Sequence, residues 1–194
     1  RDKKMEKTLT STESLAIITE MIAKAKKEST GDGGFQMLLW GWVIAVCNFG
    51  HYTLEKLGYA EPYIVWTLVI PAAIISFVKG FRSAKNAPAK SHLTTVLSQL
   101  WIIIFISMIV VLVFMGTLDF QHNPIILLLA GVGIFTTGTL VRENLVRWGG
   151  ILLLLAAFIG FLLPVTEQYL VAGIGIVLGY LVPGYHLKKK SLER

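Results

Sequence analysis

The chain alternates between long apolar stretches and short charged segments. Six stretches contain no Asp, Glu, Lys or Arg, and each is 17 to 28 residues long: Gly33–Leu54, Pro62–Val78, Ser91–Leu118, Phe120–Val141, Trp148–Thr166 and Gln168–Leu187. A helix needs about 17–25 apolar residues to cross a bilayer core about 30 Å thick. The pattern therefore predicts a polytopic membrane protein with six transmembrane helices.

Continuous apolarity favours helices over the strands of a transmembrane β-barrel. The runs Ile102–Ile106 and Ile125–Leu129 are apolar at every position, whereas barrel strands alternate apolar and polar residues over about 10 positions. We expect an all-α fold whose transmembrane domain covers 35–187. Its spans are expected at about 35–57, 62–79, 93–118, 123–141, 148–164 and 167–185.

Composition narrows the class of protein further. The chain is 54% hydrophobic and only 15% charged, whereas soluble domains carry about 25% charged residues. These values exclude an ordinary soluble enzyme, a nucleic-acid-binding domain and a disordered protein. The single cysteine, Cys47, lies inside an apolar stretch, so a disulfide scaffold and a thiolate metal cluster are excluded as well.

Basic residues predict the orientation in the membrane. Of the 18 Lys and Arg residues, 17 fall in the N-terminal segment, the second and fourth loops and the tail 188–194, and only Lys56 falls on the other side. By the positive-inside rule, both termini are expected in the cytoplasm, and the spans would form three helical hairpins in a bacterial inner (plasma) membrane. No apolar segment precedes Gly33, so the first span itself is expected to direct insertion.

The segment 1–34 is expected to be cytoplasmic and to contain an amphipathic helix at about 11–28. Thr10 and Glu13 have the spacing of a capping box, and Gly31–Gly34 is expected to break the helix before the first span. The apolar positions recur at helical spacing: Leu15, Ile18, Met21, Ile22 and Ala25. This stripe would lie on lipid headgroups, on the cytoplasmic ends of the bundle, or on the same helix of a neighbouring subunit.

A resemblance accompanies this segment. Residues Glu13–Lys26, followed by Leu38-Leu39-Trp40-Gly41-Trp42, resemble the opening of a family of small, uncharacterised bacterial multi-span membrane proteins. The resemblance covers about the first 80 residues and ends near Arg82. It implies no catalytic, cofactor-binding or partner-binding residue.

Neutral polar residues within the spans are candidates for a solute path. They are Asn48, Gln99, Thr136 and Thr137. No Asp, Glu, Lys or Arg lies deep in a span, which argues against a charge-coupled transporter. Interhelical hydrogen bonding is the alternative role for these side chains.

The outer turns suggest a candidate metal site. His51, Glu55, Asp119 and His122 lie at the predicted outer ends of the spans, and His and carboxylate side chains bind zinc and related ions. The alternative is that these are ordinary solvated polar tips.

Small residues and one proline predict how the spans pack. Gly175 and Gly179 on the last span, with Ala156 and Gly160 on the fifth, are spaced for close helix approach within the bundle or with another subunit. Pro71, in the middle of the second predicted span, is expected to kink it.

Three functions remain open from the sequence. No H-E-x-x-H, G-x-S-x-G, P-loop or paired-cysteine motif occurs, which favours a non-enzymatic assembly or regulatory membrane protein. The alternatives are a small transporter or channel for a neutral or apolar solute, and a metal-dependent membrane enzyme. The expected partners are the lipid bilayer and further copies of the chain, with no nucleic acid and no cofactor.

Overall fold

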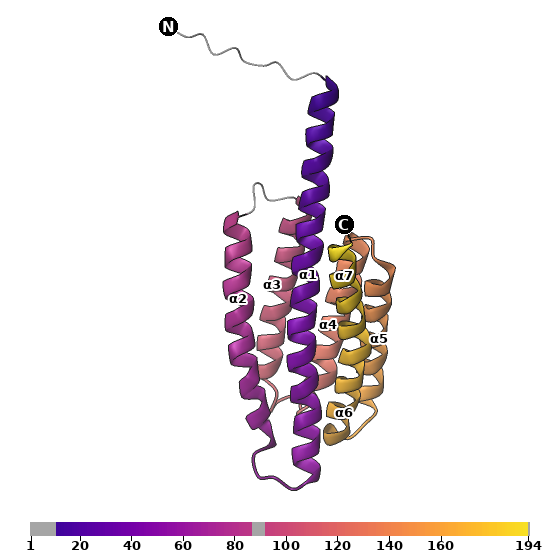
Figure 1. Ribbon diagram of the computed structural model, residues 1–194. Helices are drawn as coiled ribbons and strands as arrows, with labels where there is room; N and C mark the ends of the chain where they lie inside the picture. The colour runs from indigo at the N-terminus through magenta and orange to yellow at the C-terminus, as the bar shows by residue number, and fades with distance from the viewer. Residues whose placement is uncertain (1–10, 87–91, 194) are drawn as a thin grey trace.

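The described part of the chain is all-helical in the computed structural model (Figure 1). The structure describes the backbone of residues 11–86 and 92–193 and the side chains of residues 33–82 and 93–193. Within these ranges there is no strand, and six helices are long and apolar enough to cross a membrane. The all-helical fold and the presence of six candidate membrane spans are therefore confirmed.

The elements assemble into six rods. A 3₁₀-helix, η1, leads directly into α2, and the π-helical turn η2 joins α6 and α7 into one 28-residue rod. In chain order the elements are α1 (Ser11–Lys56), η1 (Pro62–Leu68), α2 (Val69–Asn86), α3 (His92–Val113), α4 (His122–Leu140), α5 (Asn144–Phe161), α6 (Val165–Ile176), η2 (Val177–Leu181) and α7 (Val182–Leu192).

The expected helix break at Gly31–Gly34 is wrong. Helix α1 runs without interruption from Ser11 to Lys56 and rises past the end of the other helices in Figure 1. Glycine costs a helix only about 1 kcal/mol per residue. At Gly34 it also permits close packing, because a Cβ there would lie 3.1 Å from the backbone nitrogen of Lys188. The side chains of the predicted amphipathic helix 11–28, and Thr10 of its capping box, lie outside the described residues.

The core lies among α1, α4, α5 and the α6–η2–α7 rod. Helix α1 packs along α6, η2 and α7, and α4 packs along α5. Buried residues such as Ile134 and Leu153 fill the space between these helices. Helices α2 and α3 lie at the periphery, on α1 and α4 respectively, and most of their apolar side chains are exposed. A lipid bilayer would cover such a surface.

Pro71 acts near the start of α2 instead of bending an α-helix at its middle. It is the third residue of α2, which begins directly after η1 ends at Leu68. Proline has no N–H for an intrahelical hydrogen bond, and its ring disfavours the α conformation in the preceding residue. The irregularity of this span is therefore a change from 3₁₀ to α geometry.

A second irregularity, which the sequence analysis did not predict, lies in the last rod. The N–H of Val182 donates to the carbonyl of Val177, five residues back, within the π-helical turn η2. Pro183 follows and has no N–H to donate to the carbonyl of Gly179. That carbonyl instead faces Gly149 of α5 at close range.

Candidate functional site

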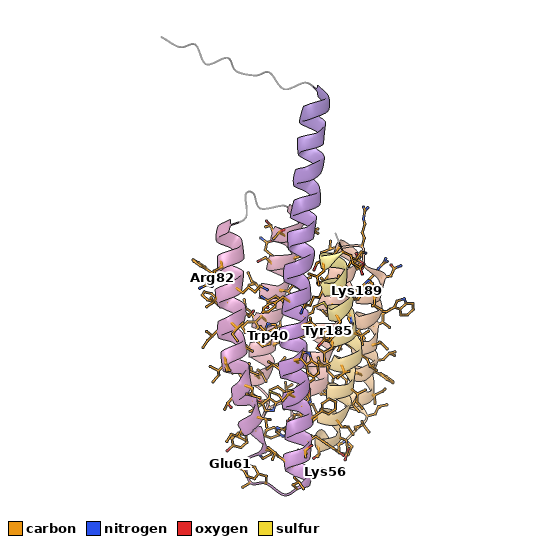
Figure 2. All side chains as sticks on the ribbon, viewed as in Figure 1. Trp40, Lys56, Glu61, Arg82, Tyr185 and Lys189 are labelled. Carbon is orange, nitrogen blue, oxygen red and sulfur yellow. The ribbon has the colours of Figure 1, made fainter. Side chains whose placement is uncertain are left out.

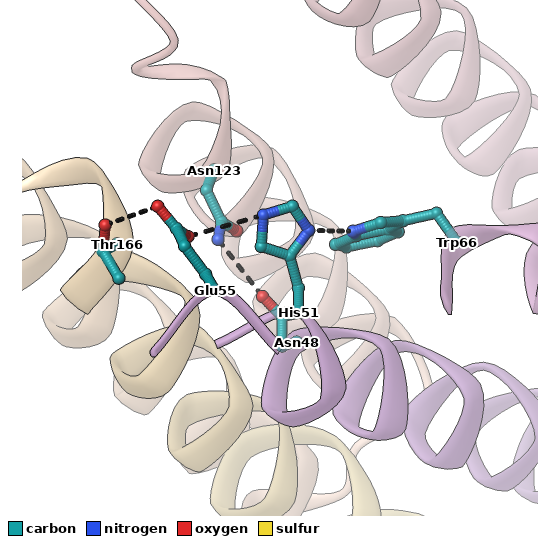
Figure 3. Close-up of polar contacts among 6 residues, drawn as sticks. All are labelled: Asn48, His51, Glu55, Trp66, Asn123 and Thr166. Atoms are coloured by element: carbon teal, nitrogen blue, oxygen red, sulfur yellow. Dashed lines mark hydrogen bonds and ion pairs between the residues drawn. The ribbon is translucent and has the colours of Figure 1, made fainter. Parts of the chain in front are cut away.

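A polar network lies at the end of the bundle where α1 terminates and α4 and α6 begin. This is the end marked by Lys56 and Glu61 in Figure 2, opposite Arg82 and Lys189. Figure 3 shows six of the network side chains, which come from α1, η1, α4 and α6. The network has two separate groups. One runs from Thr166 through Glu55 and His51 to Trp66, and the other pairs Asn48 with Asn123.

His51 is the centre of the first group. It is 9% exposed and stacks on the ring of Tyr169 with centroids 3.9 Å apart. Its Nδ1 accepts a hydrogen bond from Nε1 of Trp66 at 3.1 Å. An indole N–H can only donate, so Nδ1 carries a lone pair and the ring proton resides on Nε2. Nε2 lies 3.6 Å from Oε2 of Glu55, one helical turn away.

Glu55 extends the network from α1 to α6. Its Oε1 accepts a hydrogen bond from Oγ1 of Thr166 at 2.7 Å. Beside it, Nζ of Lys56 lies 2.6 Å from Oε1 of Glu167. Two adjacent residues at the end of α1 are thereby joined to two at the start of α6. The Oε2 atom of Glu55 is buried and has no hydrogen-bond partner among the described residues.

Two asparagines join α1 to α4. Nδ2 of Asn123 donates to Oδ1 of Asn48 at 3.1 Å, and Nδ2 of Asn48 donates to the carbonyl of Ile44 at 2.8 Å. Both asparagines are buried. A hydrogen bond between buried amides fixes the relative height of the two helices, because a shift of either would leave polar groups unpaired.

Gln168 holds the turns together beside this network. It is 1% exposed, and its Nε2 donates to Oε1 of Gln121 at 2.7 Å and to the carbonyl of Leu163 at 3.1 Å. These contacts join the start of α6 to the segments that precede α4 and follow α5.

The predicted metal set does not form a site. Among the described residues, no group of three or more His, Cys, Asp or Glu is arranged to hold a metal ion. His51 and Glu55 are paired, and the rings of His122 and Tyr169 pack in a T-shaped arrangement with their centroids 6.3 Å apart. Asp119 is exposed in the preceding turn, in a left-handed conformation with φ of 47°. The nitrogens of His51 face Trp66 and Glu55, so neither is turned toward a metal.

The four residues predicted to line a polar path also lie apart. Asn48 belongs to the network, Gln99 is exposed on α3, and Thr137 accepts a hydrogen bond from Nε1 of Trp101 at 3.2 Å. Thr136 and Thr137 stand 13 and 14 residues along α4 from Asn123, which is about 20 Å at 1.5 Å per residue. The two threonines and Asn48 therefore lie at different depths of the bundle.

The small residues predicted to pack helices do so inside the bundle. A Cβ on Gly175 would lie 2.7 Å from the Cβ of Ala156, and one on Gly179 would lie 2.6 Å from the carbonyl oxygen of Gly149. A Cβ on Gly160 would lie 3.2 Å from the ring of Pro124. These small-residue surfaces are therefore buried in contacts among α4, α5 and the α6–η2–α7 rod.

Several residues in and beside the network were missed by sequence reasoning. Trp66 and Tyr169 have the positions of interfacial aromatic residues. Thr166 and Gln168 flank the carboxylate of Glu167 at the start of a helix, where the sequence pattern predicts solvent-exposed side chains. What separates these residues from ordinary surface residues is a contact with a residue from another part of the bundle. The hydrophobic pattern of a single segment contains no information about such a contact.

Comparisons with protein-family models, with curated proteins and with solved structures give no match for this chain. Function has to be argued from the geometry. The network joins α1, η1, α4 and α6 through side chains that are engaged mainly with one another, which is the arrangement of a structural clasp.

Proposed function

We propose that the protein is an integral membrane assembly protein that self-associates through the extension of α1 beyond its membrane span. The observation that carries this proposal is the continuity of α1. The candidate span begins at Gly33, whereas the helix begins at Ser11. The 22 residues between them extend about 33 Å beyond the span at 1.5 Å per residue.

The pattern of the extension supports a helical partner. Leu15, Ile18, Ile22 and Ala25 follow one another at intervals of three, four and three residues, which is the a/d spacing of a coiled coil. An apolar stripe on one face of a helix is stable only when it is covered. Because α1 is unbroken at Gly31–Gly34, the extension continues in the direction of the span and leaves the plane of the membrane.

A second copy of the chain is the partner that fits best. Two copies inserted in one membrane have the same orientation, so their extensions are parallel and in register. Membrane insertion also raises the effective concentration of the two helices, which compensates for a coiled coil of only about two heptads. The small-residue faces are already used within the bundle, so the close-approach contacts that the sequence offered are not available for a second copy, and the extension is the surface proposed for self-association.

We further propose that both termini lie on the cytoplasmic side of a plasma membrane, with three hairpins reaching outward. The asymmetry of the basic residues supports this orientation. The alternatives of a solute path or a metal-dependent enzyme receive less support, because the candidate residues for each lie apart.

Cysteine cross-linking tests the proposal. In a Cys47→Ser background, Ile18→Cys is expected to form a covalent dimer under mild oxidation in membranes, because d-position side chains of parallel helices face each other. Ala16→Cys lies roughly 140° around the helix from the centre of the stripe and serves as the matched control. Equal cross-linking of both variants, or of neither, would refute pairing through this stripe.

A further inference from the structure

A basic surface hollow opens at the end of the bundle opposite the polar network. It lies where the short turn between α4 and α5 meets α7, and Figure 2 marks this end with Lys189. The residues that line it are Arg142, Glu143, Asn144, Leu145, Trp148, His186 and Lys190.

The positive charge of the hollow exceeds what its single carboxylate can neutralise. Glu143 is buried, and its Oε1 accepts a hydrogen bond from Nζ of Lys190 at 2.5 Å. Its Oε2 lies 3.9 Å from Nε2 of His186. Arg142 forms no ion pair with any described residue, and its backbone has a left-handed φ of 59° that places it at the tip of the turn. One guanidinium is thus left without a counter-charge.

The start of α5 adds to this positive potential. The N-cap residue of α5, Glu143, makes no side-chain capping bond, and the first helical hydrogen bond runs from the N–H of Arg147 to the carbonyl of Glu143. The guanidinium of Arg147 donates to the side-chain oxygen of Asn144, and its buried Nε has no acceptor within the described part of the chain. Two arginines beside the positive end of a helix dipole are stabilised when an anion binds there.

Apolar side chains adjoin the charged groups. Trp148 is 62% exposed, and Leu145 beside it is also exposed. Tryptophan in this position is typical of the boundary between lipid headgroups and acyl chains. The hollow therefore presents cationic groups next to apolar surface, as an anionic lipid requires.

We propose that this hollow binds the phosphate of an anionic phospholipid headgroup, with Arg142 as its principal contact and Trp148 beside the glycerol and upper acyl chains. Basic pockets between helices at the cytoplasmic face are suited to such headgroups. The inference rests on the membrane orientation proposed above and extends it, because it assigns a lipid class and a place to the interaction.

Thermal unfolding of the full-length protein in a neutral detergent tests this inference. Titration with phosphatidylglycerol is expected to raise the Tm, and phosphatidylcholine is expected to have little effect. In Arg142→Gln, the apparent affinity for phosphatidylglycerol should fall about tenfold, as expected for the loss of one charge-assisted hydrogen bond. Trp148→Leu, which leaves the charges unchanged, should weaken binding less.

Arg82→Gln is the matched control. Arg82 is an exposed arginine on α2 at the same end of the molecule, outside the hollow, and its replacement should change the affinity less than twofold. Equal stabilisation by inorganic phosphate would overturn the lipid assignment, and unchanged binding in Arg142→Gln would overturn the site. Counting subunits in the same samples reports separately on the proposed self-association, so the two proposals can fail independently.

Discussion

Glycine residues allow close helix contacts in this bundle. A Cβ on Gly149 would lie 2.4 Å from the carbonyl oxygen of Gly179, and a Cβ on Gly179 would lie 2.6 Å from the carbonyl oxygen of Gly149. The two backbones therefore approach each other reciprocally, and a side chain at either position would clash with the other backbone. The carbonyl of Gly179 is also the one to which Pro183, four residues further on, has no N–H to donate, so the π-helical turn and the crossing occupy the same place.

Alanine at either glycine is expected to destabilise the protein. Gly149→Ala and Gly179→Ala should each lower the free energy of unfolding by about 1–3 kcal/mol, because overpacking forces a backbone to move. Gly80→Ala on α2 is the control, since no atom lies within 4 Å of its added Cβ, and it should be neutral or stabilising by up to about 1 kcal/mol. Unfolding in mixed micelles measures the three variants, and equal effects would contradict this explanation.

The Asn48–Asn123 pair allows a test of the polar network. A double-mutant cycle with Asn48→Ala and Asn123→Ala should give a coupling free energy of about 0.6–2 kcal/mol, the range for interhelical hydrogen bonds in membranes. The measurement is the unfolding free energy of the two single variants, the double variant and the unmodified chain. A coupling near zero would mean that this hydrogen bond does not join α1 to α4.

At the residue scale, the sequence predicts which residues have a packing or polar role better than it predicts the residues they contact. Gly175, Gly179 and Ala156 stand out because small residues recur at helical spacing, and Asn48 because it is polar in an apolar span. The pairing of His51 with Trp66 depends on the placement of η1 beside α1, which no local pattern encodes. The expected metal set fails for the same reason, because nearness to a membrane surface does not imply convergence.

At the scale of elements, the membrane spans are predictable because the bilayer imposes both their length and their apolarity. The boundaries of the helices are less predictable. The glycines at 31–34 weaken a helix locally, but the span that follows and the packing of Gly34 on α7 support its continuation. The 3₁₀ geometry of η1 and the π-helical turn η2 arise near Pro71 and Pro183, whose presence is visible in the sequence but whose effects depend on neighbouring helices.

Continuity of α1 can be measured as a distance. Spin labels at Ala23 and Val46, in a Cys47→Ser background diluted with unlabelled protein, lie 23 residues apart on one helix. Pulsed electron paramagnetic resonance should give a single narrow distribution near the backbone separation of about 35 Å. A broad distribution at shorter distances would indicate a break at Gly31–Gly34, and Gly33→Ala should leave the narrow distribution unchanged.

At the scale of the whole molecule, the two ends differ in chemistry. One end has the clasp of His51, Glu55 and Asn48 with their partners, and the other has the basic hollow around Arg142. Helices α2 and α3 present apolar surface along the sides. Together these features describe a bundle of candidate membrane spans with chemically different ends and a helical extension on the basic side.

The proposed orientation predicts the activity of reporter fusions. Alkaline phosphatase, which is active only outside the cytoplasm, should be active when fused after Asn123 and inactive when fused after Glu143 or Lys190. The reason is that Lys and Arg residues generally keep short loops on the cytoplasmic side of the membrane. An inactive fusion at Asn123 together with an active one at Lys190 would reverse the proposed orientation.

Self-association through the α1 extension is the claim on which the proposed function depends, and subunit counting tests it most directly. The full chain, labelled with one fluorophore and diluted to low density in liposomes, should bleach in more than one step per spot. Ile18→Asp combined with Ile22→Asp should convert most spots to single-step bleaching, and Ala16→Asp should not. Single-step bleaching of the unmodified chain would contradict assembly through this helix.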